Sequence, residues 1–339
     1  MSTQPTTKPV ALVVGASRGI GRQVAIDLAK AGYHGKSPLD IININQHQML
    51  TSSLVIVSAK STTPLSTLTN LTPFPPDPNS PQSTITTVAL EITNLGLSAT
   101  AIPVDTTSQE SIQNLVKETL SLHQRIDVLV YNTGAIHWGP ISTTPLKKFL
   151  LLQRVNPEGL YTLLHFLLPH LKSSPLGSRI IVVCPPIYSR FFRGKTAYAM
   201  GKVAMSVLVK GLGMDFVREN LTTSGEKGMA ITGIWPAVAI ESAATEQFTK
   251  KDESYKRDLR KPEIFSDAIL AILEAPAEKV NGELVLDEDF LREEKGVQDF
   301  GKYSLVPGAV PRRIMPEMLP DLKVKEQDDE GMRVDSSKL

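Results

Sequence analysis

Short apolar runs alternate along this chain with longer segments in which apolar residues recur at helical spacing. The apolar runs have the length and continuity of buried strands, and they span residues 10–14, 54–57, 99–104, 126–131, 179–184, 230–235 and 284–286. Helical periodicity follows at residues 20–31, 108–123, 146–172, 196–219 and 262–274. This alternation predicts an α/β fold built on a doubly wound, mostly parallel sheet in a single domain.

Two stretches interrupt the pattern. Residues 33–53 form an insertion where a helix-to-strand connection usually takes about 2–6 residues. It is either a tolerated surface loop or a translated intron, and sequencing the mature transcript decides between them. Residues 61–87 are rich in Ser, Thr and Pro, which predicts a long mobile loop. We expect the domain to span residues 9–322, between an N-terminal tail at 1–8 and a charged tail at 323–339.

Composition narrows the function classes. The chain of 339 residues is 41% hydrophobic with a formal net charge of +1, so no global attraction to nucleic acid is expected. No apolar run approaches the roughly 20 residues that a membrane span needs, so we expect no membrane-spanning helix. The single cysteine, Cys184, excludes an internal disulfide, and the six histidines show no metal-ligand spacing.

A glycine-rich motif follows the first strand and leads into the first helix. It consists of Gly15, Ala16, Ser17, Arg18, Gly19, Ile20 and Gly21. Glycines let the backbone approach a pyrophosphate, and the first helical turn supplies N–H donors at the positive end of the helix dipole. The motif therefore predicts a dinucleotide site and a sheet of the Rossmann type. Ligands of such sheets lie beyond the carboxyl ends of the strands, where several further residues fall: Asp105, Asn132, Cys184, Pro185 and Pro236.

A second motif lies far downstream, where Tyr198 and Lys202 are four residues apart on a predicted helix. That spacing places both side chains on one helix face, and a nearby ammonium favours the phenolate, lowering a pKa of about 10. Taken singly, each motif has an ordinary explanation, in helix packing for the glycines or in a solvated helix face for the tyrosine and lysine. Their joint occurrence favours a cofactor site with a proton-transfer residue.

The two motifs resemble those of the short-chain dehydrogenase/reductase family, Gly-x-x-x-Gly-x-Gly and Tyr-x-x-x-Lys, in the expected order. The segments 184–186, 235–244 and 282–292 are similar to the hydroxysteroid dehydrogenase-like branch of that family. The resemblance covers residues 9–322 apart from 33–53. Some relatives carry an additional sterol-carrier domain, and this chain is expected to lack one.

The resemblance implies roles for individual residues. Tyr198 would protonate a carbonyl oxygen as hydride arrives from the nicotinamide, and Lys202 would tune the phenol and hydrogen-bond the nicotinamide ribose. Asn156, which is followed by a proline, would hold a proton-relay water, although a capping or kink role is an equal alternative. The cofactor would contact Gly15, Ser17, Arg18, Gly19, Ile20, Gly21, Lys60, Asp105, Asn132, Gly134, Tyr198, Lys202 and Pro236.

The chain departs from the family pattern at two places. The substrate-orienting serine usually lies thirteen residues before the tyrosine, and that position is Pro185. Cys184 stands where the branch has the serine of Ser-Pro-Pro, and a thiol is a weak donor, so carbonyl polarisation falls mainly to Tyr198. We interpret Cys184 as a buried strand-end residue. The family's Asn-Asn-Ala-Gly segment reads Tyr131-Asn132-Thr133-Gly134 here.

Charge near the second strand predicts NADP(H) as the cofactor. NAD-specific enzymes place a carboxylate at the end of this strand, whereas Lys60 stands there, with Arg18 in the glycine loop. Two cations suit a 2′-phosphate, although solvated surface roles are an alternative. Asp105 matches the family aspartate that contacts adenine, or it caps the helix that follows.

The sequence ends in Ser337, Lys338 and Leu339, the peroxisomal address, which predicts a peroxisomal location and an import receptor as partner. A disordered charged end is the alternative. We therefore expect an NADPH-linked oxidoreductase acting on a lipid-derived carbonyl or alcohol, or on an acyl-CoA-linked substrate. The competing function is a weak or inactive NADP- and lipid-binding protein. Family resemblance also suggests a homo-oligomer.

Overall fold

The computed structural model describes residues 9–31, 54–60, 62, 84–222 and 228–322. The predicted tail at 1–8, the insertion at 33–53 and the charged tail at 323–339 lie outside the described residues. So does most of the predicted loop at 61–87.

The described strands form one sheet of seven, in the order β3-β2-β1-β4-β5-β6-β7. Every neighbouring pair is parallel. The strands are β1 (Val10–Val14), β2 (Leu54–Ser58), β3 (Ser98–Ala101), β4 (Val128–Tyr131), β5 (Arg179–Val183), β6 (Ala230–Trp235) and β7 (Leu284–Leu286). The predicted doubly wound parallel sheet is confirmed.

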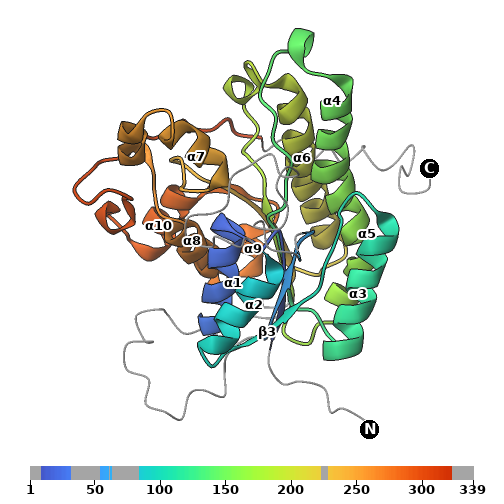
Figure 1. Ribbon diagram of the computed structural model, residues 1–339. Helices are drawn as coiled ribbons and strands as arrows, with labels where there is room; N and C mark the ends of the chain where they lie inside the picture. Colours follow the sequence, from blue (N-terminus) through green and yellow to red (C-terminus); the bar gives the residue numbers. More distant parts are fainter. Residues whose placement is uncertain (1–8, 32–53, 61, 63–83, 223–227, 323–339) are drawn as a thin grey trace.

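Helices cover both faces of this sheet (Figure 1). One side carries α1 (Gly19–Ala31), α2 (Ile85–Asn94), α8 (Glu263–Glu274), α9 (Ala277–Val280) and α10 (Asp287–Lys295). The other carries α3 (Gln109–His123), α4 (Leu146–Gln153), α5 (Gly159–Lys172) and α6 (Thr196–Arg218). The short α7 (Ala243–Thr249) follows β6. Among the described helices, none is both long and apolar enough to cross a bilayer.

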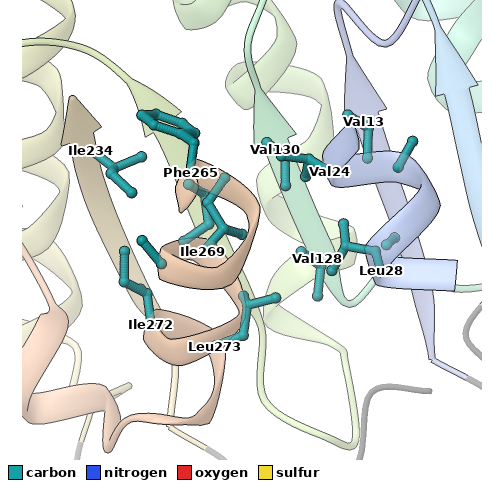
Figure 2. Close-up of a cluster of buried hydrophobic side chains, with 14 of the residues drawn as sticks. Val13, Val24, Leu28, Val128, Val130, Ile234, Phe265, Ile269, Ile272 and Leu273 are labelled. Carbon is teal, nitrogen blue, oxygen red and sulfur yellow. The ribbon is translucent and has the colours of Figure 1, made fainter. Parts of the chain in front are cut away.

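Two apolar cores explain why the strands are apolar along their whole length. Successive residues of a strand point to opposite faces, so Val128 and Val130 pack toward α1 and α8 while Leu129 and Tyr131 pack toward α3 and α5. Figure 2 shows the first core, with Phe265 of α8 lying among the side chains between the helices and the sheet. The central strands β1, β4 and β5 are buried along their whole length, as expected for a parallel sheet covered by helices on both faces, whereas the edge strand β3 is half-buried.

Helix α2 corrects part of the predicted loop. Thr84 caps this helix, its hydroxyl accepting from Thr87 N at 3.1 Å, while the Thr87 hydroxyl accepts from Thr84 N at 3.3 Å. Residues 84–87 are thus a helix start rather than loop. The signal was a capping box of two threonines followed by apolar residues at helical spacing, Val88 and Ile92.

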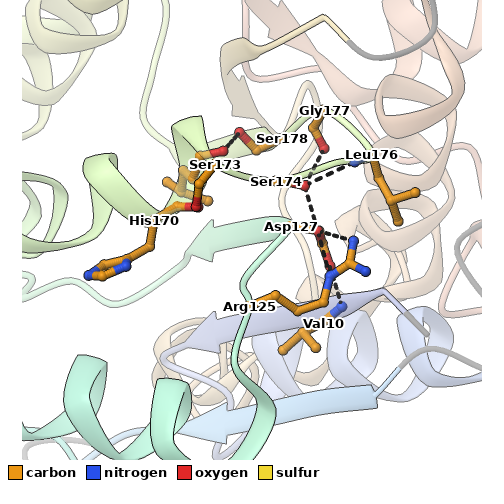
Figure 3. A network of polar contacts seen from close by, with 10 residues as sticks. Val10, Arg125, Asp127, His170, Ser173, Ser174, Leu176, Gly177 and Ser178 are labelled. Carbon is orange, nitrogen blue, oxygen red and sulfur yellow. Dashed lines mark hydrogen bonds and ion pairs between the residues drawn. The ribbon is translucent and has the colours of Figure 1, made fainter. Parts of the chain in front are cut away.

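A polar network at the amino-terminal edge of the sheet ties three segments together (Figure 3). The fully buried Asp127 carboxylate accepts from Val10 N at 2.8 Å, from Arg125 Nε at 2.9 Å and from Ser174 Oγ at 2.5 Å. Arg125 also pairs with it through Nη2 at 2.6 Å. These contacts fix the start of β1 against β4 and against the turn before β5.

We expect Asp127→Asn to lower the free energy of unfolding by about 3–5 kcal/mol, because it breaks a buried ion pair and leaves Arg125 without its counter-charge. Urea unfolding followed by circular dichroism measures this loss. Glu253→Gln is the control, since its ion pair with Lys256 is exposed and contributes little. Equal stability of Asp127→Asn and the control would contradict the role given to this network.

Candidate active site

The glycine loop packs so closely on the segment after β4 that side chains are excluded from it. A Cβ atom at Gly21 would lie 2.1 Å from Gly15 O, and one at Gly15 would lie 2.6 Å from Thr133 N. Gly15 also has a φ of +89°, in the left-handed region that favours glycine. The loop leads directly into α1, with Ser17 buried and Ile20 packed against the first core. These features fit the close backbone approach that a dinucleotide pyrophosphate needs.

Asn132 holds this loop from the neighbouring strand. Its side-chain amide donates to Gly15 O at 3.0 Å, and its backbone N–H and that of Thr133 both donate to Val14 O. The carboxyl ends of β1 and β4 are thereby fixed relative to one another. Asn132, which was predicted to contact the cofactor, therefore also positions the glycine loop within the protein.

Asn156 lies in a π-helical turn, η5 (Arg154–Glu158), between α4 and α5. Pro157 lacks an N–H group, and Gly159 N donates to Arg154 O across the wider turn. The buried Asn156 side chain accepts from Ala135 N at 3.0 Å and donates to Ala135 O at 3.2 Å. The carbonyl of Val155 accepts from the Tyr131 hydroxyl at 2.8 Å. Asn156 therefore clamps the segment after β4, and the relay water stays a prediction.

Tyr198 and Lys202 lie on α6, each with 4% of its surface exposed. Lys202 Nζ donates to Val183 O, at the end of β5, at 2.9 Å. A Cβ atom at Gly134 would lie 3.0 Å from Lys202 Nζ and 3.2 Å from Asn156 Oδ1. Because Gly134 has no side chain, the side chains of Asn156 and Lys202 can both lie close to residues 132–135, the segment after β4 that holds the glycine loop.

The pKa of Tyr198 moves in the direction opposite to the prediction. Burial raises this pKa, because the phenolate would lose its hydration. Burial also lowers the pKa of Lys202 to about 8, an effect that the Cys184 thiolate would oppose. Desolvation by burial therefore outweighs the expected lowering of the phenol pKa by Lys202, whose ammonium donates to the Val183 carbonyl. Tyr198 therefore keeps its proton at neutral pH.

The two residues at the family serine position are both buried and offer no donor to a substrate. Cys184 is fully buried directly after β5, and this burial raises the pKa of its thiol to about 12, which disfavours the reactive thiolate. Pro185 O accepts from Ser206 Oγ at 2.6 Å. The Ser206 hydroxyl is itself fully buried, so it does not replace the missing serine.

Lys60 and Asp105, both predicted to contact the cofactor, are joined to one another. Lys60 Nζ lies 2.6 Å from Asp105 Oδ2, although the lysine side chain is 77% exposed. Asp105 also accepts from the backbone and hydroxyl of Thr107, just before the helix cap Ser108. Partial burial raises the pKa of Asp105, but these hydrogen bonds outweigh it and lower the pKa overall. The sequence has no carboxylate at the end of the second strand, but Asp105, in the segment after β3, places one beside Lys60.

A cluster of aromatic side chains surrounds Tyr198, and sequence analysis missed it. Its members, called the aromatic cluster below, are Trp138, Tyr188, Phe191, Tyr198, Trp235 and Phe248. Ring centroids of Trp138 and Phe191 lie 6.5 and 6.1 Å from that of Tyr198, and Phe248 stacks on Trp138 at 5.8 Å. The rings come from the connections after β4 and after β5, from α6, from the end of β6 and from α7, so no local spacing could have indicated them.

The loop after β6 is held by a residue that sequence analysis also missed. Ala237 N donates to Asp287 Oδ1 at 2.8 Å, next to the half-buried Pro236. Burial raises the pKa of Asp287 to about 7. In the described part of the chain, no group of His, Cys, Asp and Glu side chains gathers that could hold a metal ion.

Comparisons with known proteins agree with this geometry. A family model described as short chain dehydrogenase matches residues 79–236. Hydroxysteroid dehydrogenase-like protein 2 of Danio rerio is 30% identical over 87% of this chain, and the Homo sapiens protein is 28% identical over the same share. The chain covers 60% of the length of each. A crystal structure of a short chain dehydrogenase from Mycobacterium thermoresistibile matches with a TM-score of 0.69 and 28% identity, over 90% of this chain and 93% of that one.

The chain belongs to the short-chain dehydrogenase/reductase family of oxidoreductases, whose fold binds nicotinamide cofactors. Within the family it is similar to hydroxysteroid dehydrogenase-like protein 2.

The Lys60–Asp105 pair generates a prediction about cofactor choice. Asp105→Asn should raise the affinity for NADPH relative to NADH by up to about fivefold, because Lys60 no longer has to leave a carboxylate to reach the 2′-phosphate. Lys60→Glu should shift the preference strongly the other way. Titration of both variants with each nucleotide, followed by nucleotide fluorescence, measures the ratio. Equal changes for both nucleotides would rule out a 2′-phosphate site at Lys60.

Proposed function

We propose that this protein is an NADPH-linked oxidoreductase that interconverts a lipid-derived carbonyl and its alcohol, free or linked to coenzyme A. One observation carries the proposal. Tyr198 is a nearly buried phenol four residues before Lys202 on α6, and the Lys202 ammonium reaches the segment after β4 that holds the glycine loop.

The described residues fit a nicotinamide dinucleotide. The glycine loop would hold the pyrophosphate, and Lys202 would hold the nicotinamide ribose. When bound, the reduced nicotinamide supplies a hydride to the carbonyl carbon of the substrate. Tyr198 donates its phenolic proton to the carbonyl oxygen, and the Lys202 ammonium stabilises the phenolate that remains. Asn156 acts through Ala135 by keeping the segment after β4 in place.

The protonated form of the Tyr198 phenol suits carbonyl reduction as the working direction. A phenol that holds its proton at neutral pH is ready to act as an acid, whereas oxidation of an alcohol starts from the phenolate. The nearly complete burial of the pair also excludes water, so the charge of Lys202 acts more strongly on the phenolate.

Two cations support NADPH over NADH. The loops that carry Arg18 and Lys60 are neighbours, because β1 pairs with β2 and Gly15 N donates to Ser58 O at 2.7 Å. Asp105 offsets part of the Lys60 charge, so the preference is moderate. Solved structures of this fold contain NADH in one case and NADP in others, so the fold alone does not choose.

The aromatic cluster supports an apolar substrate. Trp138 is 48% exposed, and its stacked partner Phe248 comes from α7, so the phenol is reached past apolar rings. Aromatic faces favour hydrocarbon and planar carbonyl compounds over sugars or charged head groups alone.

Pro185 favours a second function, that of a weak or inactive NADP- and lipid-binding protein. Without that hydroxyl, polarisation of the substrate oxygen falls mainly to Tyr198, and this phenol is almost fully covered. A protein of this kind would bind NADPH and lipid but reduce nothing.

Tyr198→Phe distinguishes the two functions. It should lower the rate of NADPH-dependent reduction by about 10²–10⁴-fold and leave NADPH affinity nearly unchanged, because only the transferred proton is lost. A panel of long-chain aldehydes, ketones and acyl-CoA derivatives, followed at the NADPH absorbance band, measures the rate.

Tyr188→Phe is the matched control, since its hydroxyl lies 3.2 Å from Met315 Sδ in the same cluster. Lys202→Met should impair both rate and NADPH binding, and Pro185→Ser should give at most a modest gain. Unchanged turnover in Tyr198→Phe would exclude the mechanism. NADPH binding without turnover of any carbonyl by the unmodified protein would favour the binding function.

Exposed apolar side chains support a homo-oligomer, which we propose as the working state. Leu146 and Leu150 are exposed on α4, and Met200, Val207 and Met214 are exposed on α6. Residues seven apart lie on one helix face, so α6 presents an apolar stripe suited to a second copy of the chain. Light scattering of the purified protein measures the stoichiometry.

We also propose import into peroxisomes, with Ser337–Lys338–Leu339 as the signal, although these residues lie outside the described structure. Deleting Leu339 should leave an N-terminally labelled protein folded but cytosolic, because the import receptor reads the terminal tripeptide. Fluorescence microscopy with a peroxisomal marker checks this result. Continued import of the truncated protein expressed alone would place the signal elsewhere.

A further inference from the structure

Lys195 lies beside the catalytic tyrosine although no family motif includes it. It is the residue before α6, three positions ahead of Tyr198. Its Nζ lies 4.1 Å from the ring centroid of Phe191 and 5.9 Å from that of Trp138. Because both rings also contact Tyr198, the ammonium and the phenol share the same apolar surroundings.

This ammonium has no carboxylate partner within the described ranges. Burial alone lowers the pKa of Lys195, and no negative side chain opposes that effect. Several lysines on the surface are paired with carboxylates, as in Lys250 with Glu246 at 2.9 Å and Lys256 with Glu253 at 3.0 Å. A half-buried ammonium held only by aromatic faces has lost hydration without gaining a counter-charge.

Two further cations, Arg190 and Arg193, flank Phe191 on the same connection and are exposed. The run from Arg190 to Lys195 therefore gives the rim of the aromatic cluster a positive charge. Lys60 and the glycine loop follow β2 and β1, whereas this run follows β5, separated from β1 by β4 in the sheet order. The positive rim is therefore not at the 2′-phosphate position predicted from Lys60.

We propose that Lys195 binds an anionic group of the substrate, a carboxylate or a phosphate, so that the natural substrate is an apolar carbonyl compound carrying a negative charge. This inference rests on the proposed function, because the ligand is a substrate only if the protein is a reductase. The preference for an anionic ligand can nevertheless be measured without turnover. The apolar part of the ligand lies against the aromatic cluster, and the anion completes the charge balance of Lys195.

Intrinsic fluorescence provides the measurement, because the two tryptophans of the chain, Trp138 and Trp235, both belong to the aromatic cluster. The probes are dodecanoate, methyl dodecanoate and dodecanoyl-CoA, titrated into the full chain. Lys195→Met keeps the apolar stem of the side chain and removes the charge. It should weaken dodecanoate binding by about tenfold or more and change binding of the methyl ester less than about twofold, as loss of one charge-assisted hydrogen bond predicts.

Three companion variants sharpen the result. Lys195→Arg should restore most of the dodecanoate affinity, and Lys250→Met should behave as the unmodified protein because that lysine is exposed and already paired. Weakening of dodecanoyl-CoA alone, with dodecanoate unaffected, would identify a phosphate as the anion. Tyr198→Phe should keep the preference for the anion, since the phenol does not contribute to it.

Three outcomes would overturn the inference. The first is an equal affinity of the unmodified protein for dodecanoate and its methyl ester. The second is equal weakening of both by Lys195→Met, and the third is a loss of NADPH affinity in that variant. If the protein turned over no carbonyl but still preferred anionic ligands through Lys195, the proposed reductase activity would be wrong and the anion site would be supported.

Discussion

The segment that follows β4, residues 132–135, is the point on which the whole site depends. Asn132 holds the glycine loop through Gly15 O, and Asn156 clamps Ala135 through both of its polar atoms. Gly134 lies between them, with space for the Lys202 ammonium only because it has no Cβ atom. Each of these hydrogen bonds contributes only about 1 kcal/mol to stability, but together they fix the cofactor loop relative to the proton-transfer residues.

Burial decides the chemistry within this frame. The aromatic cluster packs against the Tyr198 ring, burial raises the pKa of its phenol, and the Lys202 ammonium donates to the Val183 carbonyl. The same rings leave a positive charge at Lys195 without a counter-ion among the described residues. An apolar ligand with one negative group would suit this surface, because its apolar part would replace water over the aromatic rings and its charge would neutralise Lys195. The absence of a hydroxyl at Pro185 makes the phenol still more important for polarising a carbonyl.

Local sequence patterns predicted those parts of the structure that local physics determines. Uninterrupted apolar runs such as Val10–Val14 identified the strands, and the glycine motif identified a close-packed turn in which Gly15 and Gly21 leave no room for a Cβ atom. The helix spacing of Tyr198 and Lys202 likewise placed both on α6.

Contacts between distant segments could not be predicted in this way. Lys60 and Asp105 are 45 positions apart and meet only because β2 and β3 are neighbours in the sheet. The pKa of Tyr198 depends on rings contributed by Trp138 and Phe191, and the loop after β6 depends on Asp287, 50 positions away from Ala237. In each case the sequence contained the residues but not the topology that brings them together.

The central claim is that the glycine loop and the Tyr198–Lys202 pair form one cofactor site, joined by the segment after β4. A crystal structure of the protein with NADPH tests it most directly. We expect the pyrophosphate on the backbone of residues 15–21, the nicotinamide ring beside Tyr198, and Lys202 Nζ within hydrogen-bond distance of the ribose. A bound nucleotide whose nicotinamide lies away from Tyr198, or whose pyrophosphate avoids the glycine loop, would contradict it.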